Sequence, residues 1–114
     1  MTLAYKILTA DQWAQFQSES VFTGAPVDLA DGYIHMSTAA QLAETARRHY
    51  AGRTGLVLVE IALKPLGEAL KWEASRGGDL FPHLYGPLPT ALAVEAMPVE
   101  LDEGGVPVLG GLRE

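Results

Sequence analysis

The sequence predicts a compact single domain of the α+β class that spans residues 1–114. Thr9 with Gln12, and Thr38 with Gln41, each have the spacing of a capping box, so about two helices are expected. Five or six short apolar segments rich in β-branched residues predict strands. The composition is 48% hydrophobic without repeats, as in globular domains. A few strands combined with two helices form an α+β domain with small antiparallel or split sheets.

In the first part of the chain, a strand is expected over residues 3–8 and a helix from Thr9 to about Gln17. Residues 20–32 are expected to form a loop, because glycine, proline and an Asp-Gly pair occur in this segment. A brief strand over residues 33–36 follows it. These elements place polar side chains of the loop and the brief strand next to the second helix.

The second helix is expected to begin after Thr38 and to end at Gly52, with small and apolar residues along one stripe. Leu56–Leu63 is an almost continuous apolar run broken only by Glu60, which predicts a central strand covered on both faces. The remaining extended segments are expected at residues 70–73, 83–85, 92–99 and 106–108.

The charge of the chain limits its partners. Eight Lys and Arg against fourteen Asp and Glu give a net charge of −6, which disfavours general binding of nucleic acid. A small anionic ligand held by one or two arginines is compatible with that charge. The sequence has no cysteine, no signal-like N-terminus and no apolar run near the ~18 residues of a membrane span. We therefore expect a cytoplasmic protein with no membrane partner, and the sequence sets no oligomeric state.

Residues 73–86 form the segment richest in chemically active groups, and a loop is expected at its centre. Arg76 with the amides of Gly77 and Gly78 suits a concave anion-binding site, because glycines expose amides and a guanidinium binds phosphate oxygens in a fork. The alternative is a plain turn in which Arg76 pairs with Glu73 or Asp79. Both interpretations fit the residues equally well.

Three further residues of this segment are candidates. Glu73 could act as a general base or stabilise a developing cation, although a solvated carboxylate at a strand end needs no function. His83 could be a general acid or base, or a structural histidine beside Pro82. Tyr85 could stack on a base or a nicotinamide ring, or could simply pack.

A second candidate segment covers residues 31–38. His35 precedes a helix start, where free amides and partial positive charge suit phosphate or carboxylate. Ser37 and Thr38 could bind the same ligand, or Thr38 could serve only as the N-cap and Ser37 as a turn residue. The three histidines show none of the spacings of a helical zinc motif, so we expect no metal site.

Long motifs in both segments resemble the domain-of-unknown-function family 952. The motifs are residues 5–8 with Trp13, residues 28–38 with Gln41 and Thr45, and residues 72–87. The resemblance implies a remote similarity to the ADP-ribosyltransferase fold and its RNA 2′-phosphotransferase branch. Proteins of that fold bind NAD or ADP-ribose in a cleft between two small sheets.

On this resemblance, His35 would bind a ribose hydroxyl, Arg76 would bind a pyrophosphate, and Glu73 or His83 would hold the late catalytic position. The chain departs from the superfamily pattern because it has no clear Gln/Glu-x-Glu on a late strand. The leading hypothesis is a domain that binds an NAD- or ADP-ribose-like small molecule, as an ADP-ribosyl- or phosphotransferase-like enzyme. The alternatives are a non-catalytic sensor or accessory domain for a small anion, and a structural interaction domain.

Overall fold

The computed structural model describes residues 2–75 and 78–109, and in it the chain has the predicted α+β fold. The elements, in chain order, are β1 (Leu3–Thr9), α1 (Ala10–Glu19), β2 (Val21–Phe22), α2 (Pro26–Asp31), β3 (Ile34–His35), α3 (Ala39–His49), β4 (Leu56–Ala62), η1 (Lys64–Ala69), β5 (Leu70–Ser75), β6 (Asp79–Leu84), β7 (Leu88–Pro89), η3 (Thr90–Leu92), β8 (Ala93–Leu101) and β9 (Pro107–Val108).

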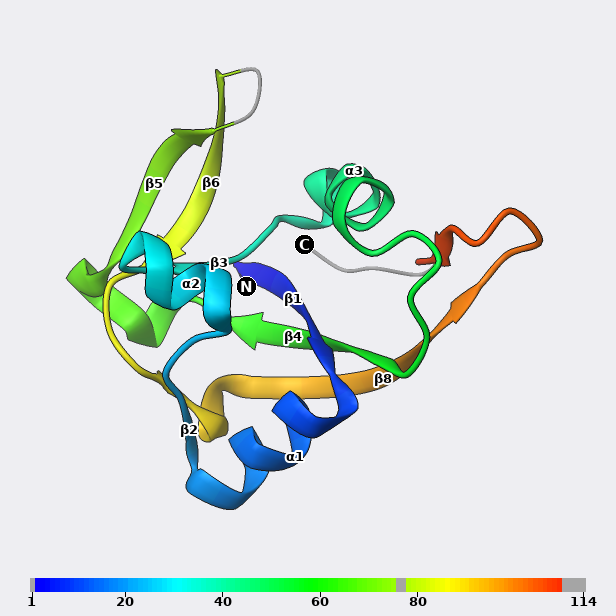
Figure 1. Ribbon diagram of the computed structural model, residues 1–114. Coiled ribbons are helices and arrows are strands. Elements are labelled where there is room, and N and C mark those ends of the chain that lie inside the picture. Colours follow the sequence, from blue (N-terminus) through cyan, green and yellow to red (C-terminus); the bar gives the residue numbers. More distant parts are fainter. Residues whose placement is uncertain (1, 76–77, 110–114) are drawn as a thin grey trace.

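The strands form small antiparallel sheets. The largest has the order β1-β4-β8-β9, a second contains β3-β6-β5, and β2 pairs with β7 (Figure 1). The apolar run from Leu56 forms β4, which lies between β1 and β8, so the prediction of a central strand is confirmed. Glu60 is buried in this strand with 2% of its surface exposed. The β5–β6 hairpin of the β3-β6-β5 sheet projects from the body beside α3 (Figure 1).

Both capping boxes form as predicted. The Thr9 hydroxyl accepts a hydrogen bond from the Gln12 amide at 3.1 Å, and the Gln12 side chain accepts one from the Thr9 amide at 2.9 Å. Thr38 and Gln41 repeat this arrangement at the start of α3. The capping boxes stabilise both helix starts because each satisfies amides that lack a partner within the helix.

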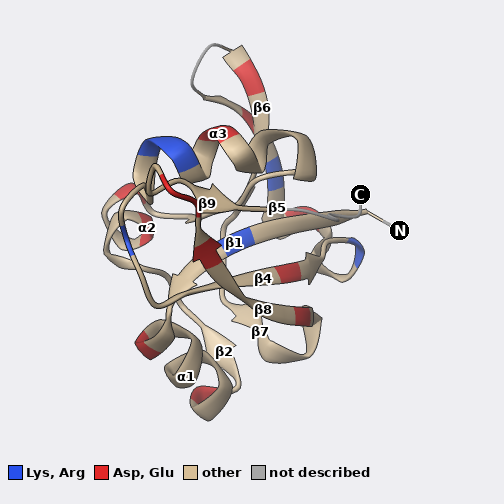
Figure 2. Ribbon diagram, turned by 90° about the vertical axis from the view of Figure 1, so that its right-hand side faces the viewer, with Lys and Arg blue, Asp and Glu red and all other residues tan. Residues whose placement is uncertain are grey.

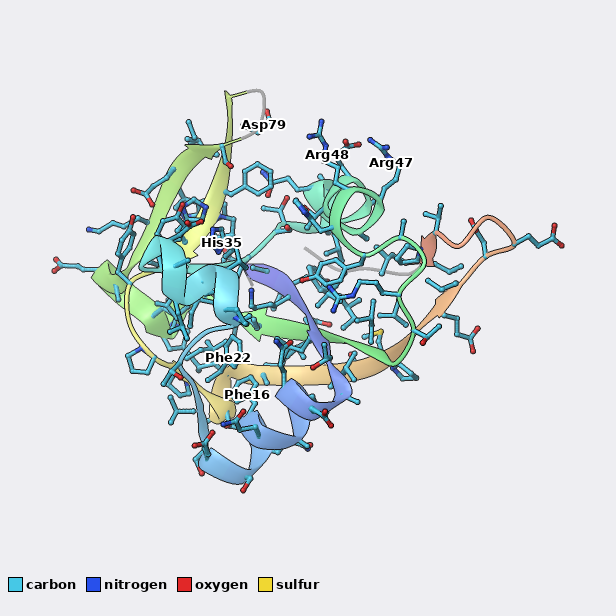
Figure 3. The ribbon with its side chains drawn as sticks, in the orientation of Figure 1. Phe16, Phe22, His35, Arg47, Arg48 and Asp79 are labelled. Atoms are coloured by element: carbon cyan, nitrogen blue, oxygen red, sulfur yellow. The ribbon has the colours of Figure 1, made fainter. Side chains whose placement is uncertain are left out.

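The helices close two halves of the core. Phe16 of α1 lies against Phe22 of β2, with ring centroids 5.6 Å apart, in the same core cluster as Val59 and Ile61 of β4 (Figure 3). On the other side, Leu42 and Ala46 of α3 pack with Tyr5 of β1. Burial of these apolar faces is the main stabilising term of such a domain. No helix in the described residues is long and apolar enough to cross a membrane.

Two expectations about loops are wrong. Residues 20–32 contain α2 rather than only loop, because Pro26 begins the helix with a suitable φ and the Asp28 carboxylate accepts a hydrogen bond from the Ala25 amide at 2.8 Å. Gly32 ends α2 in the left-handed region, at φ 88°. Residues 79–84 form β6, so much of the expected central loop of residues 73–86 is a hairpin with β5.

Candidate functional site

One face of the β3-β6-β5 sheet carries four of the nine predicted site residues. His35 lies directly opposite His83 across β3 and β6, and Lys71 lies opposite His83 across β6 and β5. Because side chains alternate along a strand, Glu73 and Tyr85 project from the same face. The fold thus brings together three candidates from the hairpin and one from β3.

A buried ion pair supports His35 from below. Nζ of Lys6 lies 3.1 Å from Oδ2 of Asp28 and donates to the main-chain carbonyl of His35 at 2.8 Å. Oδ1 of Asp28 accepts from the His35 amide at 3.0 Å and lies 2.6 Å from its Nδ1. Lys6 and Asp28 are 7% and 1% exposed, so this network belongs to the core rather than to the surface. Figure 3 shows His35 between α2 and the base of the β5–β6 hairpin.

Burial and pairing act in opposite directions on the two charges. Burial alone would raise the pKa of Asp28, but hydrogen bonds from His35 and the charge of Lys6 outweigh it and lower this pKa to about 2. Burial lowers the pKa of Lys6, and the neighbouring Asp28 carboxylate opposes that effect. Asp28 is therefore a buried carboxylate that depends on its partners to stay ionised.

The second ring nitrogen of His35 also faces a carboxylate. Nε2 lies 2.9 Å from Oδ2 of Asp31, whose side chain is 46% exposed, compared with 31% for His35. Ionised carboxylates only accept hydrogen bonds, so both contacts are satisfied together only when both nitrogens carry protons. A ligand that reaches Nε2 has to replace the exposed Asp31 and leaves the buried Asp28 contact intact.

A second histidine–carboxylate pair lies on the hairpin. Oε1 of Glu73 lies 2.9 Å from Nδ1 of His83 and accepts a hydrogen bond from the Tyr85 hydroxyl at 2.7 Å. The bonds from Tyr85 and then from His83 lower the pKa of Glu73. The same carboxylate raises the pKa of Tyr85 to about 12. Glu73 is thus held as an anion while 41% of its side chain is exposed.

Tyr33 joins the two pairs into one ring cluster, which we define as Tyr33, His35, His83 and Tyr85. Its ring is stacked on His83 with centroids 4.1 Å apart and an interplanar angle of 28°. It lies 4.6 Å from the ring of His35 and 5.2 Å from that of Tyr85. His83 is only 5% exposed, whereas Tyr85 is 44% exposed. A ligand therefore meets Tyr85 and Glu73 before it can reach the imidazole of His83.

The other predicted ligand-binding residues lie away from the ring cluster or outside the described residues. Ser37 is buried, and its hydroxyl lies 2.9 Å from that of Thr45. Thr38 uses its hydroxyl as the cap of α3. Gly78 is described, with φ 91°, whereas Arg76 and Gly77 lie outside the described residues. The prediction of an anion-binding turn at residues 76–78 remains a prediction.

An open groove of about 510 Å³ lies between α3 and β6. Its lining residues come from the first turns of α3 and from β6: Thr38, Ala40, Gln41, Glu44, Arg48, Asp79, Leu80 and Phe81. Phe81 lies two residues before His83 on the same face of β6, which connects the groove to the cluster. Figure 3 shows Arg48 on α3 facing Asp79 across this space. Within the described residues, no group of three or more potential metal-ligating side chains is present.

Sequence reasoning did not single out Lys6, Asp28, Asp31 or Tyr33 as members of the site. Two signals were available. A lysine in the apolar strand Leu3–Thr9 requires a buried anion, and an aspartate two residues after Pro26 suits the first turn of a helix. Which anion Lys6 meets depends on the packing of α2 against β3, which no local pattern specifies.

The charge distribution does not favour general binding of polyanions. Figure 2 shows acidic positions spread over α1, α3, β4 and β8, while the basic positions of α3 lie together near its end. Arg47 and Arg48 both pair with Glu44, so these two cations are already partly neutralised. Across residues 2–75 and 78–109, the basic positions form no extended face of the kind that nucleic acids require.

Comparison with known proteins identifies a family and a relative with a solved structure. The model of the family described as "Protein of unknown function (DUF952)" matches residues 7–96. A crystal structure of protein CC0527 from Caulobacter crescentus is 49% identical, with 96% of each chain covered and a TM-score of 0.93. A solution NMR structure of CC0527 is 49% identical over 96% of this chain and 95% of that one, with a TM-score of 0.86. No curated protein matches the chain.

Proposed function

The chain belongs to the DUF952 family of proteins of unknown function, and we propose that its ring cluster binds an NAD- or ADP-ribose-like nucleotide. The observation that carries the proposal is the position of Glu73, an exposed carboxylate fixed by Tyr85 and His83 beside four ring side chains. Flat rings bind flat heterocycles by stacking, and a fixed carboxylate binds hydroxyl groups. A nucleotide presents both kinds of group a few ångströms apart.

The nucleotide ring would stack on Tyr85. This ring is 44% exposed and is held in place by its hydrogen bond to Glu73. Tyr33 lies beside it, with centroids 5.2 Å apart, and would form the adjoining wall. The ring of Tyr33 also covers His83, so we assign His83 to positioning Glu73 rather than to contact with the ligand.

The ribose would lie between Glu73 and His35. Binding would release Nε2 of His35 from Asp31 and direct it toward a ribose hydroxyl, with Asp28 still fixing Nδ1. The phosphates would extend into the groove beside Phe81 and Arg48, near the start of α3. Ser37 and Thr38 would hold the start of α3 in place rather than contact the phosphates. Arg76 with Gly77 and Gly78 would supply the remaining anion contacts.

The same geometry suits transfer of ADP-ribose. The bond between the ribose C1′ and nicotinamide would break with its electron pair leaving on nicotinamide, and positive charge would develop on the ribose. The Glu73 carboxylate would stabilise that charge. A hydroxyl acceptor, water included, would then form the new bond to C1′ and lose its proton to solvent. A cytoplasmic location is part of the same proposal.

The test is a titration of isotopically labelled protein with NAD and with ADP-ribose, followed by amide shifts in NMR. We expect saturable shifts at residues 33–35, 73 and 83–85. Nicotinamide release from NAD should fall strongly in Glu73→Gln, because the charge is lost, while ADP-ribose binding is kept, because the amide oxygen of Gln still accepts from a ribose hydroxyl. Glu19→Gln, an exposed carboxylate change on α1, is the matched control.

The outcomes separate binding from transfer. Binding without nicotinamide release would make the chain a non-catalytic sensor or accessory domain and remove the transfer step. No shifts at millimolar ligand would contradict nucleotide binding altogether, and the cluster would then be a structural feature of an interaction domain.

A further inference from the structure

Strand β5 has one unpaired edge. It is the outer strand of the β3-β6-β5 sheet, and no strand in the described residues pairs with its far side. Figure 1 shows β5 on the side of the hairpin away from α3. Of the other long strands at sheet edges, β1 is bridged at Tyr5 to Ser37, and β8 pairs on its outer side with β9 at Glu100 and Leu101. An open strand edge presents free amides and carbonyls that can pair with another chain.

Hydrogen bonding to β6 determines which residues of β5 face outward. Pro82 lies opposite Trp72, and its carbonyl accepts from the Met36 amide at 3.1 Å on the β3 side. Trp72 and Pro82 are therefore a non-hydrogen-bonded pair, so the amide and carbonyl of Trp72 point away from β6. By alternation those of Ala74 also point outward. The amide of Leu70 donates a hydrogen bond to the Gly67 carbonyl. On this edge, Leu70 therefore offers a new partner only its carbonyl.

The geometry points to pairing of β5 with β5 of a second copy of this chain, and we propose a two-fold antiparallel dimer centred on Trp72. In that register the amide and carbonyl of Trp72 bond to those of Trp72 in the other copy. The Ala74 amide meets the Leu70 carbonyl. The main-chain pattern is thus self-complementary, as a two-fold interface requires.

The charges of the strand select this register. Lys71 of one copy lies directly opposite Glu73 of the other, and the symmetry places the same pair on the other side of Trp72. The main-chain groups of Lys71 and Glu73 face β6, so between the two copies these residues form non-hydrogen-bonded pairs. Opposing side chains lie closest in such pairs. Charges on an edge strand commonly prevent pairing, but here the two-fold register joins opposite charges.

Apolar surface surrounds the same edge. Trp72 is 42% exposed and Leu80, on the same side of the hairpin, is 55% exposed. Pairing would cover part of this surface in both copies. The contact is small, so we expect weak association that depends on protein concentration. It also has a consequence for the site, because Lys71 of the second copy would add a cation beside Glu73.

Charge reversal tests the register. Lys71→Glu and Glu73→Lys should each weaken self-association by about tenfold or more, because each places like charges opposite one another. An equimolar mixture of the two variants should associate, since every facing pair is then opposite in charge. Arg47→Glu, which changes the net charge by the same amount as Lys71→Glu but lies on α3, should leave association unchanged. Sedimentation velocity over a concentration series measures all four samples.

Amide hydrogen exchange supplies an independent readout. The amides of Trp72 and Ala74 should gain protection as protein concentration rises, whereas that of Glu73, already bonded to β6, should not change. Association of the mixture also shows that both variants are folded. A wild-type protein that stays monomeric at millimolar concentration would overturn the proposal, even if its edge captured an extended peptide. A dimer insensitive to both reversals would overturn it as well.

Discussion

Oδ1 of Asp28 contacts His35 twice: it lies 2.6 Å from Nδ1 of the imidazole and accepts a hydrogen bond from the main-chain amide of His35 at 3.0 Å. Oδ2 of the same carboxylate accepts from the amide of Ala25, just before α2. One buried side chain therefore fixes the start of a helix, the position of β3 and the orientation of a candidate ligand-binding ring. Lys6 neutralises its charge.

Asp28→Asn should destabilise the fold strongly. The substitution leaves the buried Lys6 ammonium without its counterion, and breaking a buried pair from one side typically costs about 3–5 kcal/mol. The pKa of Lys6 should fall further, because the carboxylate that opposes the effect of burial is gone. Urea unfolding at neutral pH measures the change. The control is Asp31→Asn, which changes the exposed carboxylate that contacts Nε2 of His35. We expect its free energy of unfolding to stay within about 0.5 kcal/mol of the wild-type value.

The stability of the protein should fall in acid because of this same group. The pKa of Asp28 is lowered to about 2 from 3.8, so its contribution is complete above the higher value and is lost as the pH falls through the lower one. The free energy of unfolding should fall by on the order of 2 kcal/mol as Asp28 becomes protonated. Urea unfolding between these two pH values should show a shallower pH slope in Asp28→Asn than in the wild type. Equal slopes would place the acid sensitivity elsewhere.

Local signals predicted most of the fold. Thr9 and Thr38 each form their capping boxes through atoms three residues apart, and the apolar run from Leu56 forms the central strand. The segment 20–32 was misread because its turn-forming residues outnumber its helical ones. There, α2 is stabilised by the Asp28 carboxylate and by contact with β3, and neither is a local property.

The candidate site was predicted only where its residues share a strand or a hairpin. Glu73, His83 and Tyr85 lie close in sequence, and the β5–β6 register brings them together on one face. Lys6 and Asp28 are 22 residues apart and meet only because β1 and α2 both pack around β3. Tyr33 reaches the hairpin because β3 pairs with β6 at Ile34 and His35. Such long-range contacts follow from tertiary packing, which sequence periodicity does not contain.

The hydrogen bond between Tyr85 and Glu73 should be visible in the titration of both groups. In Glu73→Gln the pKa of Tyr85 should fall from about 12 toward 10, because the carboxylate that stabilises its protonated form is removed. In Tyr85→Phe the pKa of Glu73 should rise, since its largest stabilising contact is lost. Ultraviolet titration of tyrosine and carboxyl-carbon NMR measure the two shifts. Tyr50→Phe, a tyrosine of the other core cluster, should leave the Glu73 pKa unchanged.

Tyr33 should control access to His83. Its ring is stacked on the imidazole, and the His83 side chain is 5% exposed in consequence. Tyr33→Ala removes this cover, so diethyl pyrocarbonate should modify His83 faster than in the wild type, as measured by mass spectrometry of the peptide that contains it. Tyr33→Phe keeps the ring and should modify at the wild-type rate, provided that the amide spectrum of each variant shows a folded protein. An unchanged rate in Tyr33→Ala would mean that the strands rather than the tyrosine shield His83, and ligand contact with its imidazole would then require the hairpin itself to move.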